Sequence, residues 1–261
     1  MSAARTVVVH ADGSLLAAAA AARLVTRLVD AQAARGHAHV VLTGGGAGIA
    51  ALSALAASPA RDAVDWARLD VWWGDERFLP TGHPDRNETQ ARTALLDHVR
   101  VPAARVHPMP ASDGRWGPDV DAAAAGYADQ LAAAAGTAEH GGVPAFDVLM
   151  LGVGPDGHVA SLFPGQPALY EQARTVVGVH GSPKPPPVRV SLTFPALCRA
   201  HEVWFLAAGP EKAAAVAMAL GDAGPYAIPA AGVRGTSSTL WLLDRSAAAQ
   251  VPPALTRIAS P

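Results

Sequence analysis

The chain of 261 residues contains a single cysteine, Cys198. One cysteine cannot form an internal disulfide framework, and it cannot supply a Cys-x-x-Cys metal site. The sequence also lacks the His-Glu-x-x-His spacing of zinc hydrolases and the Gly-x-Ser-x-Gly elbow of α/β-hydrolases. We therefore expect neither a bound metal nor a serine-nucleophile mechanism.

Charge of one sign is not in excess, because 22 acidic side chains balance 20 Lys and Arg for a formal net charge of −2. A basic excess would indicate a nucleic-acid partner, and a charge block would indicate a disordered tail. No run approaches the roughly 18 apolar residues that cross a bilayer. The first residues lack the apolar core of a secretory signal. These features predict a cytoplasmic protein without nucleic-acid or membrane partners.

What the chain does contain is a regular alternation of short β-branched runs with longer Ala- and Leu-rich segments. Strands are predicted at 6–10, 40–43, 69–73, 146–151, 188–192, 203–208 and 239–243. Helices are predicted over 15–35, ended by Gly36, and over 49–57, 87–98 with Asn87 as N-cap, 119–135 and 211–220. This alternation predicts an α/β fold, a mostly parallel sheet with helices on both faces. No repeat or linker marks a boundary, so we expect one domain over 1–261.

The first candidate binding segment is Thr-Gly-Gly-Gly-Ala-Gly at 43–48, between a predicted strand and helix. Glycines expose backbone N–H groups there, and the helix N-terminus adds the positive end of its dipole. Such a turn attracts a phosphate or carboxylate, which makes Thr43, Gly44, Gly45 and Gly46 predicted ligands. The alternative is a tight connection that binds nothing. No Lys-Ser or Lys-Thr follows, so the segment is not a Walker A loop.

A second candidate is Trp-Trp-Gly-Asp-Glu-Arg-Phe at 72–78, where a predicted strand runs into a polar loop that extends to about residue 86. Asp75 is suited to proton transfer, and Arg77 to holding an oxyanion or phosphate. The two opposite charges could instead pair with each other. The polar stretch 81–87 is longer than a minimal connection requires, which favours a functional loop.

The third candidate follows the buried run 148–151 and reads Gly-Val-Gly-Pro-Asp-Gly-His at 152–158. Ligands bind at the carboxyl ends of strands in open α/β sheets. A histidine on a rigid turn there, His158, with the carboxylate of Asp156 two residues away, is suited to act as a general base. The segment also matches Gly-x-Gly-x-x-Gly. Pro155 in the turn and Pro164 soon after it argue against the crossover helix of a dinucleotide site, so we expect no cofactor.

Three cations complete the set of candidate residues. Four prolines within 183–187 stiffen the approach to a strand and carry Lys184 and Arg189 on a rigid support. Lys212 follows another strand, in a first helical turn where a cation is disfavoured by the helix dipole unless an anion binds nearby. Solvated surface charge is the alternative interpretation of the 182–189 segment.

Four motifs together resemble a known family. They are Gly-Asp-Glu-Arg-Phe at 74–78, Gly-Pro-Asp-Gly-His-Val-Ala-Ser-Leu-Phe-Pro at 154–164, Ser-Pro-Lys-Pro-Pro at 182–186 and Trp-Leu-Leu-Asp at 241–244. The chain resembles the 6-phosphogluconolactonases of the glucosamine-6-phosphate isomerase/6-phosphogluconolactonase family over nearly its whole length. The resemblance implies a Rossmann-like parallel sheet and a site for phosphorylated sugars.

Two details refine the resemblance. The deaminases of this family usually carry Asn-Glu-Pro, with a catalytic Glu, shortly after the Asp-Gly-His turn. This chain has Ser161-Leu162-Phe163-Pro164 there, which favours the lactonases. The family's glycine turn commonly continues with Ser-Thr-Pro, whereas here residues 46–48 are Gly-Ala-Gly. Phosphate binding at that turn would then depend on backbone N–H groups and Thr43.

The resemblance implies hydrolysis of 6-phospho-D-glucono-1,5-lactone to 6-phosphogluconate, the second step of the oxidative pentose phosphate pathway. His158 would activate water and Asp156 would orient the imidazole. Arg77 or a backbone N–H would stabilise the oxyanion, and Asp75 is the weaker catalytic candidate.

The 6-phosphate is expected among Gly45, Gly46, Lys212 and Arg189, with Lys184 nearby. The partner is thus a small phosphorylated sugar lactone, and we expect a monomer or weak homodimer. The alternatives are a glucosamine-6-phosphate deaminase or aldose–ketose isomerase, and a non-catalytic sugar-phosphate-binding protein.

Overall fold

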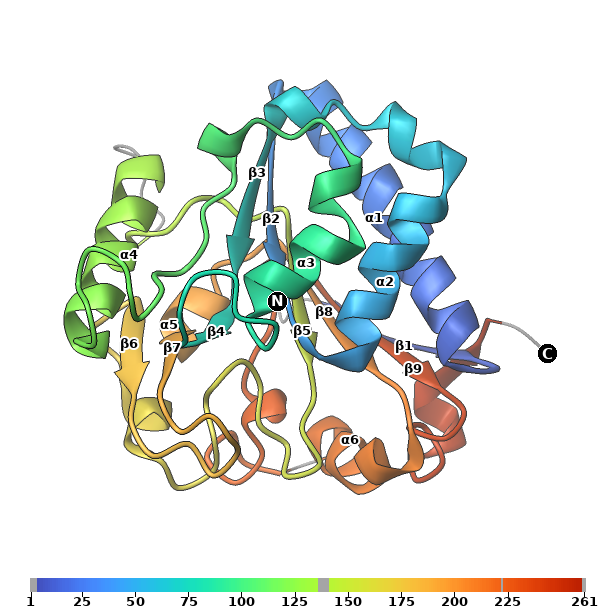
Figure 1. Cartoon of the computed structure of the whole chain (residues 1–261). Helices are drawn as coiled ribbons and strands as arrows, with labels where there is room; N and C mark the ends of the chain where they lie inside the picture. The colour runs from blue at the N-terminus through green and yellow to red at the C-terminus, as the bar shows by residue number, and fades with distance from the viewer. Residues whose placement is uncertain (1–3, 136–140, 222, 260–261) are drawn as a thin grey trace.

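A seven-stranded parallel sheet forms the centre of the computed structural model, which describes residues 4–135, 141–221 and 223–259 (Figure 1). The strand order is β10-β1-β9-β8-β5-β2-β3. The bounds are β1 Ala4–His10, β2 Ala38–Leu42, β3 Leu69–Trp73, β5 Val148–Gly152, β8 Glu202–Ala207, β9 Ser238–Asp244 and β10 Thr256–Ile258. Every neighbouring pair runs parallel, which confirms the predicted α/β class.

Helices flank this sheet, and α1 and α2 pack side by side (Figure 1). The bounds are α1 Gly13–Arg35, α2 Gly45–Ala57, α3 Asn87–Ala94, α4 Val120–Ala135, α5 Phe194–Leu197 and α6 Ala213–Leu220. The end of α1 follows the sequence prediction, because Gly36 takes a φ of 80° that caps the helix in the left-handed conformation. Among the described residues, no helix is both long and apolar enough to cross a membrane.

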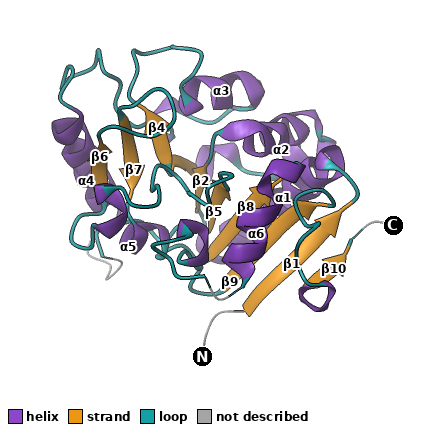
Figure 2. Ribbon diagram, turned by 90° about the horizontal axis from the view of Figure 1, so that it is seen from below, coloured by secondary structure: helices purple, strands orange, loops and turns teal. Residues whose placement is uncertain are grey.

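A second, three-stranded sheet has the order β4-β7-β6 and lies with α4 and α5 on the side of the molecule away from β10 (Figure 2). Its strands are β4 Asp75–Arg77, β6 Val176–Val179 and β7 Arg189–Leu192, and both pairings are antiparallel. The strand predicted at 188–192 therefore exists, but it belongs to this sheet rather than to the parallel one. The prediction missed β6 entirely.

The segment predicted as a polar loop from residue 74 contains β4. Charged residues usually indicate a loop, but here Asp75 pairs with Ser191 and Arg77 with Arg189 on β7. Side chains alternate along a strand, so Asp75 and Arg77 share one face while Glu76 points the other way and is fully buried. This alternation places two charged side chains at the site and one in the interior.

Three helix starts also differ from the prediction, and α2 begins at Gly45 rather than at residue 49. Asn87 is the first residue of α3 rather than its N-cap, and α3 ends at Ala94, followed by a short 3₁₀ turn at Leu96–His98. The predicted helix from residue 211 begins instead with a 3₁₀ turn at Pro210–Lys212, after which α6 starts.

Candidate active site

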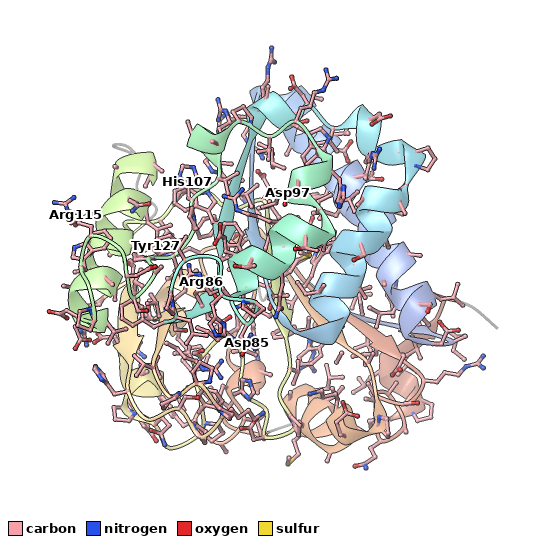
Figure 3. All side chains as sticks on the ribbon, in the orientation of Figure 1. Asp85, Arg86, Asp97, His107, Arg115 and Tyr127 are labelled. Atoms are coloured by element: carbon pink, nitrogen blue, oxygen red, sulfur yellow. The ribbon has the colours of Figure 1, made fainter. Side chains whose placement is uncertain are left out.

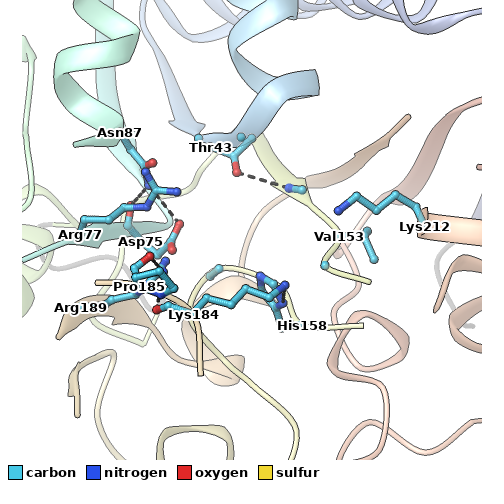
Figure 4. A pocket seen from close by; sticks show the side chains of 15 residues that line it. Thr43, Asp75, Arg77, Asn87, Val153, His158, Lys184, Pro185, Arg189 and Lys212 are labelled. Atoms are coloured by element: carbon cyan, nitrogen blue, oxygen red, sulfur yellow. Dashed lines mark hydrogen bonds between the residues drawn. The ribbon is translucent and has the colours of Figure 1, made fainter. Parts of the chain in front are cut away.

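A cavity of about 290 Å³ opens at the carboxyl ends of β2 and β5, which are neighbours in the parallel sheet (Figure 4). Its lining residues are Thr43, Gly44, Gly45, Asp75, Arg77, Asn87, Gly152, Val153, Gly154, His158, Ala160, Lys184, Pro185, Arg189 and Lys212. Of the eleven predicted site residues, all but Gly46 and Asp156 line it. Gly46 is exposed in the first turn of α2, and Asp156 hydrogen-bonds to the His158 ring.

Two glycine turns line the cavity. The first glycine turn, residues 43–46, joins β2 to α2, and the Thr43 hydroxyl accepts a hydrogen bond of 3.3 Å from the Gly152 N–H. Gly44 is the N-cap of α2 and provides no capping side-chain bond. The first backbone N–H groups of α2 therefore stay available to an anion, as the sequence pattern predicts.

The second glycine turn, residues 152–158, presents side chains instead. The Gly157 N–H donates to the Gly154 carbonyl, and Gly157 has a φ of 79°, which favours glycine. A Cβ on Gly154 would lie 1.9 Å from His158 Nδ1. Gly154 therefore makes room for the imidazole. The chain after Gly157 is irregular until the 3₁₀ turn at Pro167, which agrees with the argument against a crossover helix.

The imidazole and carboxylate predicted as a pair are in contact. His158 Nδ1 lies 2.5 Å from Asp156 Oδ1, and Lys184 Nζ lies 3.3 Å from the same ring nitrogen. Burial opposes ionisation of Asp156, but the His158 hydrogen bond and the charges of His158 and Lys184 outweigh it. The pKa of Asp156 therefore falls well below its ordinary value, and this carboxyl remains ionised.

The carboxylate on Nδ1 assigns the ring proton to that nitrogen, because an ionised carboxylate can only accept. No residue in the described parts of the chain hydrogen-bonds to Nε2, and the ring lines the cavity with 17% of the side chain exposed. Phe163 supports the ring from one side at a centroid distance of 4.3 Å. This arrangement leaves Nε2 as a basic nitrogen available to a water molecule in the cavity.

The opposite side of the cavity is formed by β4 and the start of α3. The Asp75 carboxylate accepts a 2.7 Å hydrogen bond from the Ser161 hydroxyl, and Asn87 Nδ2 donates to the Asp75 carbonyl at 2.8 Å. Arg77 donates to the Asp85 carbonyl at 2.5 Å. In the described chain no ion pair joins Asp75 to Arg77, so the alternative that they simply neutralise each other does not apply.

The three predicted cations approach the cavity in different ways. Lys184 extends toward His158, and Lys212 reaches in from the other direction (Figure 4). Burial lowers the pKa of Lys212, with the Glu211 carboxylate 4.0 Å away partly opposing that shift. Lys184 stands in the proline-rich segment before β7, as predicted, whereas Lys212 ends a 3₁₀ turn and precedes α6 instead of lying in its first turn.

Arg189 also has a structural role that the sequence did not predict. Its guanidinium is buried and donates to the carbonyls of Lys184, Pro185 and Pro186 at 3.0 to 3.1 Å. Burial lowers the pKa of this guanidinium. Arg189 thus holds the proline-rich segment in shape while still lining the cavity.

Sequence reasoning missed several lining residues, chief among them Asn87 and Ala160. Ala160 has a φ of 48°, the only positive value among the described non-glycine residues, directly before the Ser161 that holds Asp75. Such a conformation is costly for alanine and is typical of functional sites. No sequence signal marked it. Asn87 carried one signal, its position at the end of the polar loop, which we interpreted as a helix cap.

Within the described residues, no group of three or more His, Cys, Asp or Glu side chains is placed to hold a metal ion.

Comparison with known sequences gives a consistent result. A family model described as glucosamine-6-phosphate isomerases/6-phosphogluconolactonase matches residues 11–241. A 6-phosphogluconolactonase of Streptomyces coelicolor is 64% identical over 248 residues, which cover 95% of this chain and 95% of the relative. A 6-phosphogluconolactonase of Mycobacterium tuberculosis is 53% identical, covering 92% of this chain and 96% of the relative.

Solved structures agree in fold. The 6-phosphogluconolactonase of Trypanosoma brucei superposes with a TM-score of 0.82 at 29% identity, covering 96% of this chain and all of that one. A monomeric glucosamine-6-phosphate deaminase has a TM-score of 0.75 at 17% identity, covering 93% of this chain and 99% of that one. The second likeness shows a shared fold alone.

Proposed function

The chain belongs to the glucosamine-6-phosphate isomerase/6-phosphogluconolactonase family, and we propose that it hydrolyses 6-phospho-D-glucono-1,5-lactone to 6-phosphogluconate. One observation carries this proposal. A histidine with a free Nε2, oriented by a carboxylate, shares a small cavity with four cationic side chains and the uncapped N-terminus of α2. The oriented histidine suits ester hydrolysis. The cations and the helix N-terminus suit the binding of a phosphorylated substrate. The names of relatives more than 50% identical support the same substrate.

Water attack begins the proposed reaction. His158 Nε2 takes a proton from water as the water oxygen bonds to the lactone carbonyl carbon. Asp156 stabilises the imidazolium that forms, and its lowered pKa keeps it negatively charged for that purpose. General-base help of this type contributes about 10²–10⁴ in rate.

The tetrahedral intermediate needs a donor for its oxyanion. The Arg77 guanidinium or a backbone N–H of a glycine turn provides it in this proposal. The bond from the carbonyl carbon to the ring oxygen then breaks, and His158 returns its proton to that oxygen. A lactonase transfers no proton at a substrate carbon, so we assign Asp75 no acid–base step.

The phosphate group is proposed to bind near Lys212, Lys184 and the N–H groups of Gly45 and Gly46. Binding energy from this remote group would hold the lactone carbonyl over His158. Arg189 contributes positive charge and keeps Lys184 in place through the loop carbonyls. The cytoplasmic location and the monomeric or weakly dimeric state remain predictions of the sequence.

The test is a timed assay with freshly prepared lactone, with and without protein, because the lactone also hydrolyses spontaneously. Acceleration is expected for the phosphorylated lactone and not for unphosphorylated glucono-1,5-lactone. Lys212→Ala should raise KM for the phosphorylated lactone about tenfold, the equivalent of about 1.4 kcal/mol of binding. Equal hydrolysis of both lactones would contradict the phosphate site, and ammonia release from glucosamine 6-phosphate would favour the deaminase alternative.

A further inference from the structure

Asn87 stands between two parts of the cavity that come from distant segments of the chain. Its Nδ2 donates to the Asp75 carbonyl at 2.8 Å and lies 3.4 Å from Asp75 Oδ1. On the other side, a Cβ placed on Gly44 would lie 2.0 Å from Asn87 Oδ1 and 2.6 Å from its Cγ. One side chain therefore contacts both β4 and the first glycine turn. Figure 4 shows Asn87 beside Asp75 and Arg77.

The amide orientation follows from these contacts. The backbone carbonyl of Asp75 can only accept, so the atom facing it is the Nδ2 donor. Asn87 is 2% exposed, and its Oδ1 has no hydrogen-bond partner among the described residues. Within the described chain, the amide is thus held at its Nδ2 end, by Asp75.

The backbone of Asn87 is held independently of its side chain. The buried Glu76 carboxylate accepts hydrogen bonds from the N–H groups of Asn87 at 2.6 Å and Glu88 at 2.9 Å. Arg86, at the N-cap position, provides no capping side-chain bond and instead binds carbonyls, such as that of Met109 at 2.7 Å (Figure 3). Glu76 thus caps α3 from β4 and fixes the position from which the Asn87 side chain extends.

We propose that Asn87 is a positioning residue of this active site, which holds the Asp75 carboxylate and the first glycine turn in register across the cavity. This inference rests on the proposed lactonase function. Asn87 makes no proton transfer of its own. It acts through Asp75, which Ser161 holds from the second direction, and through Gly44 at the start of α2.

A donor at Nδ2 is essential in this proposal, and that requirement separates positioning from space filling. An Asn87→Asp side chain has nearly the same shape but would place a second carboxylate against Asp75. The charged groups around the pair are Arg77 on β4, Arg189 on β7, Glu76 on β4, and Arg86 and Glu88 at the start of α3. Repulsion from Asp75 raises the pKa of a carboxyl introduced at 87, so protonation would restore a donor.

The experiment compares Asn87→Asp with Asn87→Ala in the lactone assay. At about pH 8, we expect kcat/KM to fall roughly tenfold for Asn87→Ala and roughly 100-fold for Asn87→Asp, through both KM and kcat, because the first glycine turn binds the phosphate that places the lactone over His158. Relative to wild type, Asn87→Asp should recover as the pH falls toward about 5.5, whereas Asn87→Ala should not. An Asn87→Asp variant as active as or more active than Asn87→Ala, or with no recovery at low pH, would overturn the proposal.

Thr93→Asp is the matched control. It adds the same charge at an exposed position of the same helix, six residues further on and outside the cavity lining, and should keep wild-type kcat/KM across the pH range. A wild-type protein without lactonase activity would refute the proposed function. Active wild type with unchanged Asn87 variants would refute only the positioning role.

A substitution at Gly44 tests the contact between Asn87 and the first glycine turn without altering α3. Gly44→Ala should lower kcat/KM in the wild-type background, because its Cβ would collide with Asn87. In the Asn87→Ala background the collision is gone, so the same substitution should then cost much less. Purely additive effects of the two substitutions would contradict the contact as the cause.

Discussion

The two glycine turns that line the cavity differ in the role of their glycines. Gly45 and Gly157 each take a positive φ, which shapes the backbone. Gly44 and Gly154 instead make room for a side chain: Gly44 for Asn87 of α3, and Gly154 for His158 of its own turn. Neither turn would accommodate a Cβ at those two positions without displacing a neighbour.

The turns also lead into different structure. A helix begins at once after the first turn, so its N–H groups remain aligned and suited to an anion. Irregular chain comes after the second turn, and its contribution is the Asp156–His158 pair. Two adjacent parallel strands thus bring anion binding and proton transfer to one edge of the sheet.

The largest expected loss of activity is that of His158→Gln, which changes the proposed general base on the second glycine turn. It removes the basic nitrogen while keeping an amide of similar reach, so kcat should fall about 10²–10⁴-fold with little change in KM. Initial rates above the spontaneous background measure this, and the thermal unfolding midpoint checks that the fold is kept. Turnover near the wild-type value would exclude His158 as the base.

Gly154→Ala sharpens the comparison without changing any functional side chain. The added Cβ would lie 1.9 Å from His158 Nδ1 and 2.4 Å from Asp156 Oδ1, so both side chains must move. Displacement of a catalytic group by about 1 Å costs about 10² in rate. Activity should drop by that order while far-UV circular dichroism stays unchanged. Full activity would mean that the pair is not confined as the structure shows.

The smallest expected effect concerns Glu76, which supports Asn87 beside the first turn. Burial raises the pKa of Glu76 from 4.5 to about 7, and it outweighs the Arg86 charge and the bonds from Glu88, Asn87 and Arg77. The folded protein therefore keeps this proton at pH values where the unfolded chain has lost it. Stability from this group is fully present below pH 4.5 and is lost as the pH rises through 7.

Urea unfolding tests this sign. As the pH rises from about 5.5 to about 7.5, ionisation of Glu76 should lower the free energy of unfolding of the wild type by about 2 kcal/mol. Glu76→Gln has no carboxyl to ionise and should lack this decrease. The difference between the two pH profiles cancels the other titrating groups. Parallel profiles would mean that burial does not perturb this carboxyl.

The sequence predicted most of the parallel sheet because its strands are apolar runs separated by amphipathic helices. It also located the second glycine turn, since Asp156 and His158 follow a buried strand directly. It failed at β4, where three charged residues form a strand only because β7 pairs with them. That pairing joins residues more than 100 positions apart, and no local pattern encodes it.

The role of Asn87 at the site was likewise not predictable from the local sequence. Its sequence context, a polar residue before a helical segment, is typical of a helix cap, and the cap is in fact supplied by Glu76 from β4. The role of Arg189 in holding the loop carbonyls was hidden for a similar reason. The residue types at 87 and 189 indicated polar roles, but the groups that they bind are distant in sequence or in loops and are identified only by the structure.

The position of β1 has a consequence for biosynthesis. Residues 4–10 pair with residues 238–244 on one side and with residues 256–258 on the other. After its synthesis, β1 therefore waits until residues 238–258 have been translated before it can acquire either neighbour. Until then its backbone is an unprotected edge, and the nascent protein depends on its helices and on β2, β3, β5 and β8 for whatever order it has.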